Sequence, residues 1–166
     1  MLMVATPSHA RQKDIGVGTD VGVSWSKERA AQVSRDEAFR PVGTTRSPAQ
    51  AVKYLLELAE AGTGGYWGLC LTLADDAYMP DGPRVNNAFA QWYRAKDAGR
   101  AHRKDPYPPI GAQMFWDPGH ASGHIATYVG DGKAVTNMPD GTVKAIKWHK
   151  MDEWGPYLGW ADPYYK

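Results

Sequence analysis

The sequence is poor in cysteine, in net charge and in long apolar runs. Cys70 is the single cysteine among 166 residues, so no disulfide can form within the chain. The 19 Lys and Arg residues nearly balance the 18 Asp and Glu residues, and the net charge of +1 provides no broad positive field for nucleic acid. No segment approaches the roughly 18 apolar residues of a membrane span. We therefore expect neither a nucleic-acid partner nor a membrane partner.

The first 14 residues also lack the apolar stretch of roughly 7 to 15 residues that a signal peptide needs. We expect a protein that is made in the cytoplasm. An extracellular target would then require release by lysis or a dedicated secretion route.

Large aromatic side chains are plentiful, with seven Trp and nine Tyr, and 43% of the residues are hydrophobic. This composition and length fit one domain with a real core. We place that domain at residues 47–166 and treat residues 1–46 as an N-terminal extension, in which residues 26–39 have the composition of a short polar helix.

Three helices are predicted in the first half of the domain. Ser47 and Pro48 form a start signal for a helix that reaches about residue 61, with apolar residues at helical spacing. A second helix begins at or near Cys70. A third begins at Asn86 or Asn87 and ends at Gly99.

The second half shows short strand patterns separated by turn residues. The predicted strands cover residues 112–116, 124–129, 133–137, 142–148 and 157–160, and residues 100–109 read as a polar crossing loop. Helices followed by an antiparallel sheet indicate an α+β domain.

Cys70 is a candidate nucleophile because of its place at a helix start. Unpaired amides and the helix dipole there favour a thiolate, so we expect a depressed pKa. Gly64, Gly65 and Gly68 leave room for a substrate backbone, and the Cys70 amide could hold a developing oxyanion.

His124 is the best placed of five histidines to act as the base. It opens a strand after the small-residue turn that ends at Gly123, at the sheet edge where a helix end can meet it. His102 and His120 lie in polar loops and read as solvated.

The group that orients His124 depends on the register of the following hairpin. A two-residue turn at 131–132 places Asn137 on the His124 face, whereas a three-residue loop places Thr136 there. We predict Asn137. One cysteine and scattered histidines offer no metal ligand set, so we expect neither a metal nor a cofactor.

Each of these residues also has a purely structural explanation. A single free cysteine is often a buried small hydrophobic residue, and a strand histidine is often part of the core. The aromatic residues can serve core packing rather than line a groove for substrate.

Two stretches resemble bacterial and phage cell-wall cysteine peptidases of the NlpC and CHAP type, as in phage endolysins. Trp67-Gly68-Leu69-Cys70-Leu71 is similar to their nucleophile helix. Residues 108–137, with a Pro-x-Gly-x-x-x-Phe-Trp strand, a Gly-His pair and a Tyr-x-Gly-Asp-Gly hairpin, are similar to their second signature. The ending at 157–165 is similar too, so the resemblance covers roughly residues 48–166.

The resemblance implies a papain-like fold, with N-terminal helices packed on a C-terminal antiparallel sheet. It also implies a cysteine peptidase that hydrolyses an amide bond in the stem peptide or cross-bridge of peptidoglycan. Cys70 would be the nucleophile, His124 the base and Asn137 the third residue, with Trp67, Gly68 and Gly123 contacting substrate. The Leu residues that flank Cys70 replace the Asp-Cys-Ser of many NlpC members.

The expected partner is bacterial peptidoglycan, reached after release or secretion, and we expect a monomer. Three alternatives stay open. They are an N-acetylmuramoyl-L-alanine amidase on the same scaffold, a non-catalytic wall-binding module, and a cysteine acyltransferase or deamidating toxin.

Overall fold

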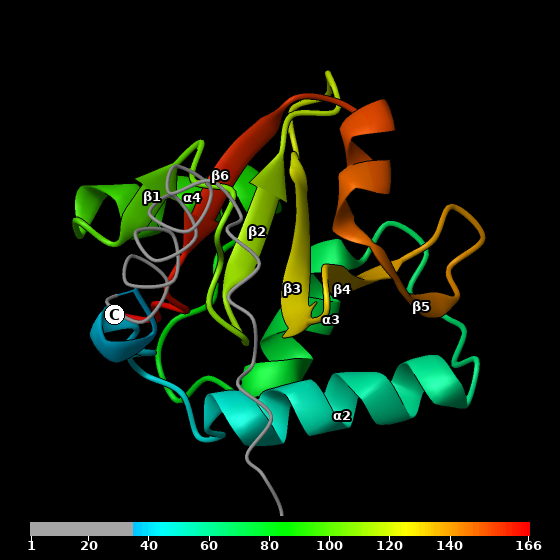
Figure 1. Ribbon diagram of the computed structural model, residues 1–166, viewed down its shortest axis with the longest axis horizontal. Helices are drawn as coiled ribbons and strands as arrows, with labels where there is room; N and C mark the ends of the chain where they lie inside the picture. The colour runs from blue at the N-terminus through cyan, green and yellow to red at the C-terminus, as the bar shows by residue number, and fades with distance from the viewer. Residues whose placement is uncertain (1–34) are drawn as a thin grey trace, which may run out of the picture.

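An antiparallel sheet of six strands organises the computed structural model, which describes residues 35–166. The strands lie side by side in the order β1-β6-β2-β3-β4-β5 (Figure 1). Their bounds are Ala101–Arg103 (β1), Gln113–Trp116 (β2), His124–Gly130 (β3), Lys133–Asn137 (β4), Val143–Lys147 (β5) and Tyr157–Ala161 (β6). Because β6 pairs between β1 and β2, the end of the domain is built into the middle of the sheet.

Three helices precede the central strands: α2 (Pro48–Glu60), α3 (Cys70–Tyr78) and α4 (Ala88–Asp97). Ser47 caps α2 in a capping box, in which its hydroxyl accepts from the Gln50 amide and the Gln50 side chain accepts from the Ser47 amide. The Asn87 side chain caps α4 by accepting from the Ala90 amide.

The sheet separates two apolar layers because side chains alternate along each strand. On one face Phe115, Ile125 and Val135 pack against α2, α3 and α4. On the other face Met114 and Trp160 pack with Trp148 and Met151 of η1, the 3-10 helix at Trp148–Glu153. Figure 1 shows α2 running along one end of the sheet and η1 beside the far ends of the strands.

This architecture confirms the predicted α+β class, and each predicted helix and strand of the domain has a counterpart. Two elements were not predicted. Strand β1 lies within the stretch expected to be a crossing loop, and η1 follows β5. The expectation that His102 is solvated was wrong, because it pairs with Trp160 in the sheet, stacks on that indole at 3.6 Å and is partly buried.

Residues 35–46 of the predicted extension contact the domain. Phe39 is buried against Trp160, and Val42 forms a bridge with Tyr164. The remaining residues, 1–34, lie outside the described part of the chain, as does most of the polar helix predicted at 26–39. None of the described helices is long and apolar enough to cross a bilayer.

Candidate active site

Cys70 is the first residue of α3, as the sequence predicts. The chain reaches it through Gly68 in a left-handed conformation (φ 66°), which a residue with a side chain adopts less readily. At a helix start the first amides have no carbonyl partner within the helix. The Cys70 sulfur therefore lies beside unpaired backbone N–H groups.

Burial dominates the electrostatics of this thiol. It raises the pKa of Cys70 above its ordinary value, while backbone hydrogen bonds from Ile125, Leu71 and Cys70 itself act in the opposite direction and are smaller. The expected depression of the pKa was wrong, because desolvation outweighs the amides of the helix start. The contact with Ile125 brings the sulfur to the residue that directly follows His124.

The hairpin of β3 and β4 has a register different from the predicted one. Thr127 pairs with Val135 and Tyr128 with Ala134, and an irregularity follows at Gly130. Thr136 therefore shares the face of His124, and Asn137 points to the opposite face. The placement of Asn137 beside His124 was wrong. The turn at 131–132 has two residues, but a bulge between Tyr128 and Gly130 adds a residue to β3 and shifts the pairing by one.

Thr136 takes the position expected for Asn137. His124 Nε2 lies 2.8 Å from Thr136 Oγ1. The same hydroxyl donates its proton to the Asn137 carbonyl at 3.3 Å, so toward the imidazole it acts as an acceptor. This pattern places the His124 proton on Nε2 and leaves the lone pair of Nδ1 free to take a proton.

His124 is enclosed by aromatic rings. The Trp154 ring meets it edge-on at 5.2 Å, and the Trp116 ring lies at 6.3 Å. Burial lowers the pKa of His124 to about 4, and the nearby charge of His120 adds to the decrease. At neutral pH the imidazole is therefore uncharged and able to act as a base.

Asn137 instead anchors the loop that leads to Cys70. Its Nδ2 donates to the Tyr66 carbonyl at 2.7 Å, and its Oδ1 is buried without a hydrogen-bond partner in the described structure. The Tyr66 amide donates to the Gly141 carbonyl at 3.0 Å. The nucleophile loop is thus tied to the β4 strand and to the turn after it.

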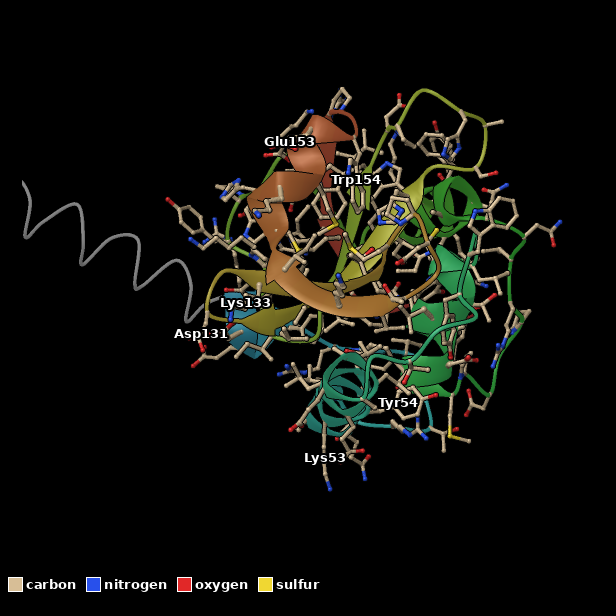
Figure 2. The ribbon with its side chains drawn as sticks, turned by 90° about the vertical axis from the view of Figure 1, so that its right-hand side faces the viewer. Lys53, Tyr54, Asp131, Lys133, Glu153 and Trp154 are labelled. Carbon is tan, nitrogen blue, oxygen red and sulfur yellow. The ribbon has the colours of Figure 1, made fainter. Side chains whose placement is uncertain are left out.

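Two cavities meet at Gly68. One, of about 350 Å³, is lined by His124 and by mostly apolar residues: Trp67, Gly68, Pro118, His120, Asn137, Met138, Pro139 and Trp154. The other, of about 220 Å³, is lined by Cys70 and more polar residues, among them Thr72, Asp75, Arg84, Asn86 and Ser122. Trp154, which lines the first of these cavities, lies at the end of η1 (Figure 2).

The structure thus brings His124 and Thr136 together and places Cys70 beside the strand that carries them. No hydrogen bond joins Cys70 to His124, and each lines its own cavity. In an enzyme without substrate such hydrogen bonds are often long and shorten only in the complex.

The residues expected to contact substrate divide into two groups. Trp67, which is 76% exposed, and Gly68 line the cavity of His124. Gly123 is buried, and a methyl group there would lie 2.9 Å from the Phe89 ring. Gly123 therefore allows α4 to approach the turn before His124.

The body of α3 is held by a buried polar network. The Tyr165 hydroxyl donates to Asp75 Oδ1 at 2.8 Å and accepts from Gln113 Nε2 at 2.9 Å, and Gln91 Nε2 donates to Gln113 Oε1 at 3.0 Å. Tyr78 donates to the Gly111 carbonyl at 2.6 Å. Burial raises the pKa of Asp75, against the hydrogen bond from Tyr165.

The described residues contain no group of three His, Cys, Asp or Glu side chains arranged to hold a metal ion.

Sequence reasoning missed Thr136 as the partner of His124, and it missed the Asp75 network. The alternative register pointed to Thr136, since a three-residue loop places it on the His124 face. No local pattern indicated that Tyr165 would reach Asp75, because 90 residues separate them.

Comparisons with known proteins give a similarity to solved structures. No family model matches the chain, and no curated protein matches it. Among solved structures, the chain is similar to the crystal structure of an NlpC/P60 family protein from Bacillus cereus ATCC 10987, with a TM-score of 0.49 and 18% sequence identity. The match covers 72% of this chain and 41% of that chain.

Proposed function

We propose that this protein is a cysteine-dependent amidohydrolase that cleaves an amide bond in the peptide part of bacterial peptidoglycan. The observation that carries the proposal is the arrangement at the start of β3. There, the thiol at the first residue of α3 lies against the backbone of Ile125, and His124, the residue before Ile125, is oriented by Thr136. The sequence resemblance to cell-wall cysteine peptidases supports peptidoglycan as the substrate.

The directions of the two pKa shifts favour a state in which Cys70 and His124 are both uncharged before the reaction begins. Burial raises the pKa of Cys70 and lowers that of His124 to about 4, so a free thiol and a free imidazole face the substrate at pH 7. The proton then moves from the sulfur to His124 Nδ1 as the sulfur attacks the carbonyl carbon. Thr136 stabilises the imidazolium by accepting from Nε2–H.

The tetrahedral intermediate then collapses. His124 returns the proton to the leaving amine, the C–N bond breaks, and an acyl thioester remains on Cys70. Water, deprotonated by His124, attacks the thioester, and the carboxylic acid product leaves while Cys70 regains its proton. Backbone amides at the head of α3 are placed to bind the oxyanion in both halves of the reaction.

The decisive test is digestion of purified sacculi by the wild type and by Cys70→Ala, followed by mass spectrometry of the released fragments. We expect peptide fragments from the wild type and none from the variant. Equal release by both proteins would contradict the thiol mechanism. Release by neither would contradict peptidoglycan as the substrate and favour an acyltransferase or deamidase acting on a protein.

The same fragments identify the bond. New amino and carboxyl ends within the stem peptide or cross-bridge indicate an endopeptidase, as in a phage endolysin or a bacteriolytic effector. Release of whole stem peptides from the glycan indicates an N-acetylmuramoyl-L-alanine amidase. In either case the protein acts on the wall after release or secretion, and we propose that it does so as a monomer.

A further inference from the structure

A further groove, separate from the two cavities of the candidate active site, has a volume of about 560 Å³. It is formed between α4, β1, the residue after β2 and the start of β6. Its lining residues are Phe89, Trp92, Tyr93, Lys96, Ala101, Arg103, Lys104, Asp117 and Leu158. Its volume lies within the roughly 300–1,000 Å³ typical of ligand sites.

The groove combines aromatic surface with positive charge. Tyr93 is 55% exposed, its ring lies 6.4 Å from that of Phe89, and the Lys96 amine lies 5.9 Å from its centre. Exposed aromatic faces pack against the C–H groups of sugar rings, and cations beside them pair with acidic groups.

The charges of the groove are unbalanced. Lys96, Arg103 and Lys104 face a single carboxylate, Asp117, and that carboxylate accepts from the Gly119 amide. The Lys104 amine donates to the Tyr157 carbonyl. Within residues 35–166, the Arg103 guanidinium has no hydrogen-bond or ion-pair partner, so it is available to an anion.

Helix α4 borders both the groove and the Cys70 cavity. Asn87 and Ala88 line the Cys70 cavity, and the next residue, Phe89, lines the groove. The Phe89 amide donates to the Ser122 carbonyl at 3.1 Å, and Ser122 also lines the Cys70 cavity. The groove and the Cys70 cavity are therefore bordered by adjacent residues of one helix, close enough for a single polymer to contact both.

We infer that this groove binds the glycan strand of peptidoglycan, with sugar rings against Phe89 and Tyr93 and the carboxylates of an attached stem peptide against Lys96 and Arg103. The inference rests on the proposed wall substrate and adds a second contact beyond the scissile peptide. Phe89, Tyr93 and Lys96 of α4, together with Arg103 of β1, would hold the strand while a neighbouring stem peptide reaches Cys70.

The test measures binding of the protein to purified sacculi in a Cys70→Ala background, where no substrate is consumed. The groove variant carries Lys96→Gln and Arg103→Gln. The control variant carries Lys53→Gln and Lys133→Gln, which remove the same charge from exposed positions on α2 and β4. Both control residues are labelled in Figure 2, a view from the right of Figure 1, whereas α4 and β1 lie at the left of Figure 1.

We expect the groove variant to bind sacculi about tenfold more weakly than its parent and the control variant to stay within twofold, at low salt where charges are little screened. Tyr93→Ala in the same background should weaken binding several-fold even at high salt. Equal binding by the groove variant and its parent would overturn the inference. Equal weakening of both double variants would overturn it as well, since the effect would then be one of total charge.

A second arm uses sacculi stripped of covalently attached phosphate polymers. The tenfold difference should persist on these sacculi, and its disappearance would mean that the groove takes a phosphate polymer instead of the glycan. Digestion of sacculi by the wild type is measured separately. Failure to digest contradicts the proposed function, whereas the binding comparison decides the role of the groove.

Discussion

Helix α3 carries Cys70 at its first residue and Asp75 further along, and the two side chains meet very different surroundings. Cys70 borders a cavity, and no other side chain in the described part of the chain makes a hydrogen bond to its sulfur. Asp75 is 3% exposed and is bonded to Tyr165, which is bonded in turn to Gln113. We call Cys70, the candidate nucleophile, the head of α3, and the rest of the helix its body. Hydrogen bonds anchor the body to the sheet.

The difference between the surroundings of Cys70 and those of Asp75 suits a helix that carries a nucleophile. A nucleophile needs freedom to approach a substrate carbon, but the backbone that carries it needs a fixed position, because small displacements of a reacting group cost much of the rate. In α3 the anchoring hydrogen bonds lie away from the reacting atom. Changes to the head should therefore alter rate with little loss of stability, and changes to the body should do the reverse.

The largest expected effect is at the head. His124→Ala removes the base and should lower kcat for sacculus digestion about 10³-fold, within the range for loss of general acid–base catalysis. The thermal midpoint should change little. His149→Ala, which removes an exposed histidine of η1, is the matched control and should keep the wild-type rate. A comparable rate loss in both variants would remove His124 from its assigned role.

Changes to the hydrogen bonds that anchor the body of α3 should lower the free energy of unfolding. Tyr165→Phe leaves Asp75 and Gln113 without the hydroxyl that joins them, and we expect the free energy of unfolding to fall by about 2–3 kcal/mol in urea titrations. Tyr164→Phe is the control, because that hydroxyl makes no hydrogen bond among the described residues. A large loss of kcat per folded molecule in Tyr165→Phe would break the proposed division between head and body.

Thr136 and Asn137 test which residue orients the base. Thr136→Val keeps the shape but removes the acceptor of His124 Nε2, so kcat should fall roughly 10- to 100-fold, while Thr136→Ser should recover most of it. Thr127→Val, a buried threonine on the other face of the sheet, is the control. If Thr136→Val keeps full activity over the whole pH profile, Thr136 does not orient His124.

The smallest effect concerns pH and the stability that His124 contributes. Its pKa is about 4 in the folded state and about 6.5 in the unfolded state, so the unfolded chain binds the additional proton between these values. Stability is therefore lost as the pH falls through this window, by about 1 kcal/mol between pH 7 and pH 5.5. Chemical unfolding of the wild type and of His124→Gln at both pH values measures this loss, which should be about 1 kcal/mol smaller in the variant. A residual loss is expected there, because burial also lowers the pKa of His102.

Much of the fold could be predicted because its signals are local. Ser47 and Pro48 mark the start of α2, and Asn87 caps α4, as hydrogen-bonding side chains do in any protein. Strand β1 escaped prediction because it has only three residues, two of them polar, and its partner β6 lies nearly sixty residues later. Pairing across such a distance leaves no periodic pattern in the sequence.

The candidate site could also be predicted only where its signals are local. The helix start of Cys70 and the strand position of His124 follow from neighbouring residues. The partner of His124 depends on one residue in a turn, because a bulge at Gly130 moves every later side chain of β4 to the opposite face. The thiol pKa could not be predicted, since it depends on burial by elements distant in sequence.

Cys70, at the head of α3, is also the only sulfhydryl in the entire chain. Any thiol-selective reagent, whether an alkylating agent, a fluorophore or a spin label, can therefore react at one position only. One mass increment per molecule then counts the molecules whose Cys70 is reduced and accessible. A reporter attached there senses events at the mouth of the cleft without engineering a cysteine elsewhere.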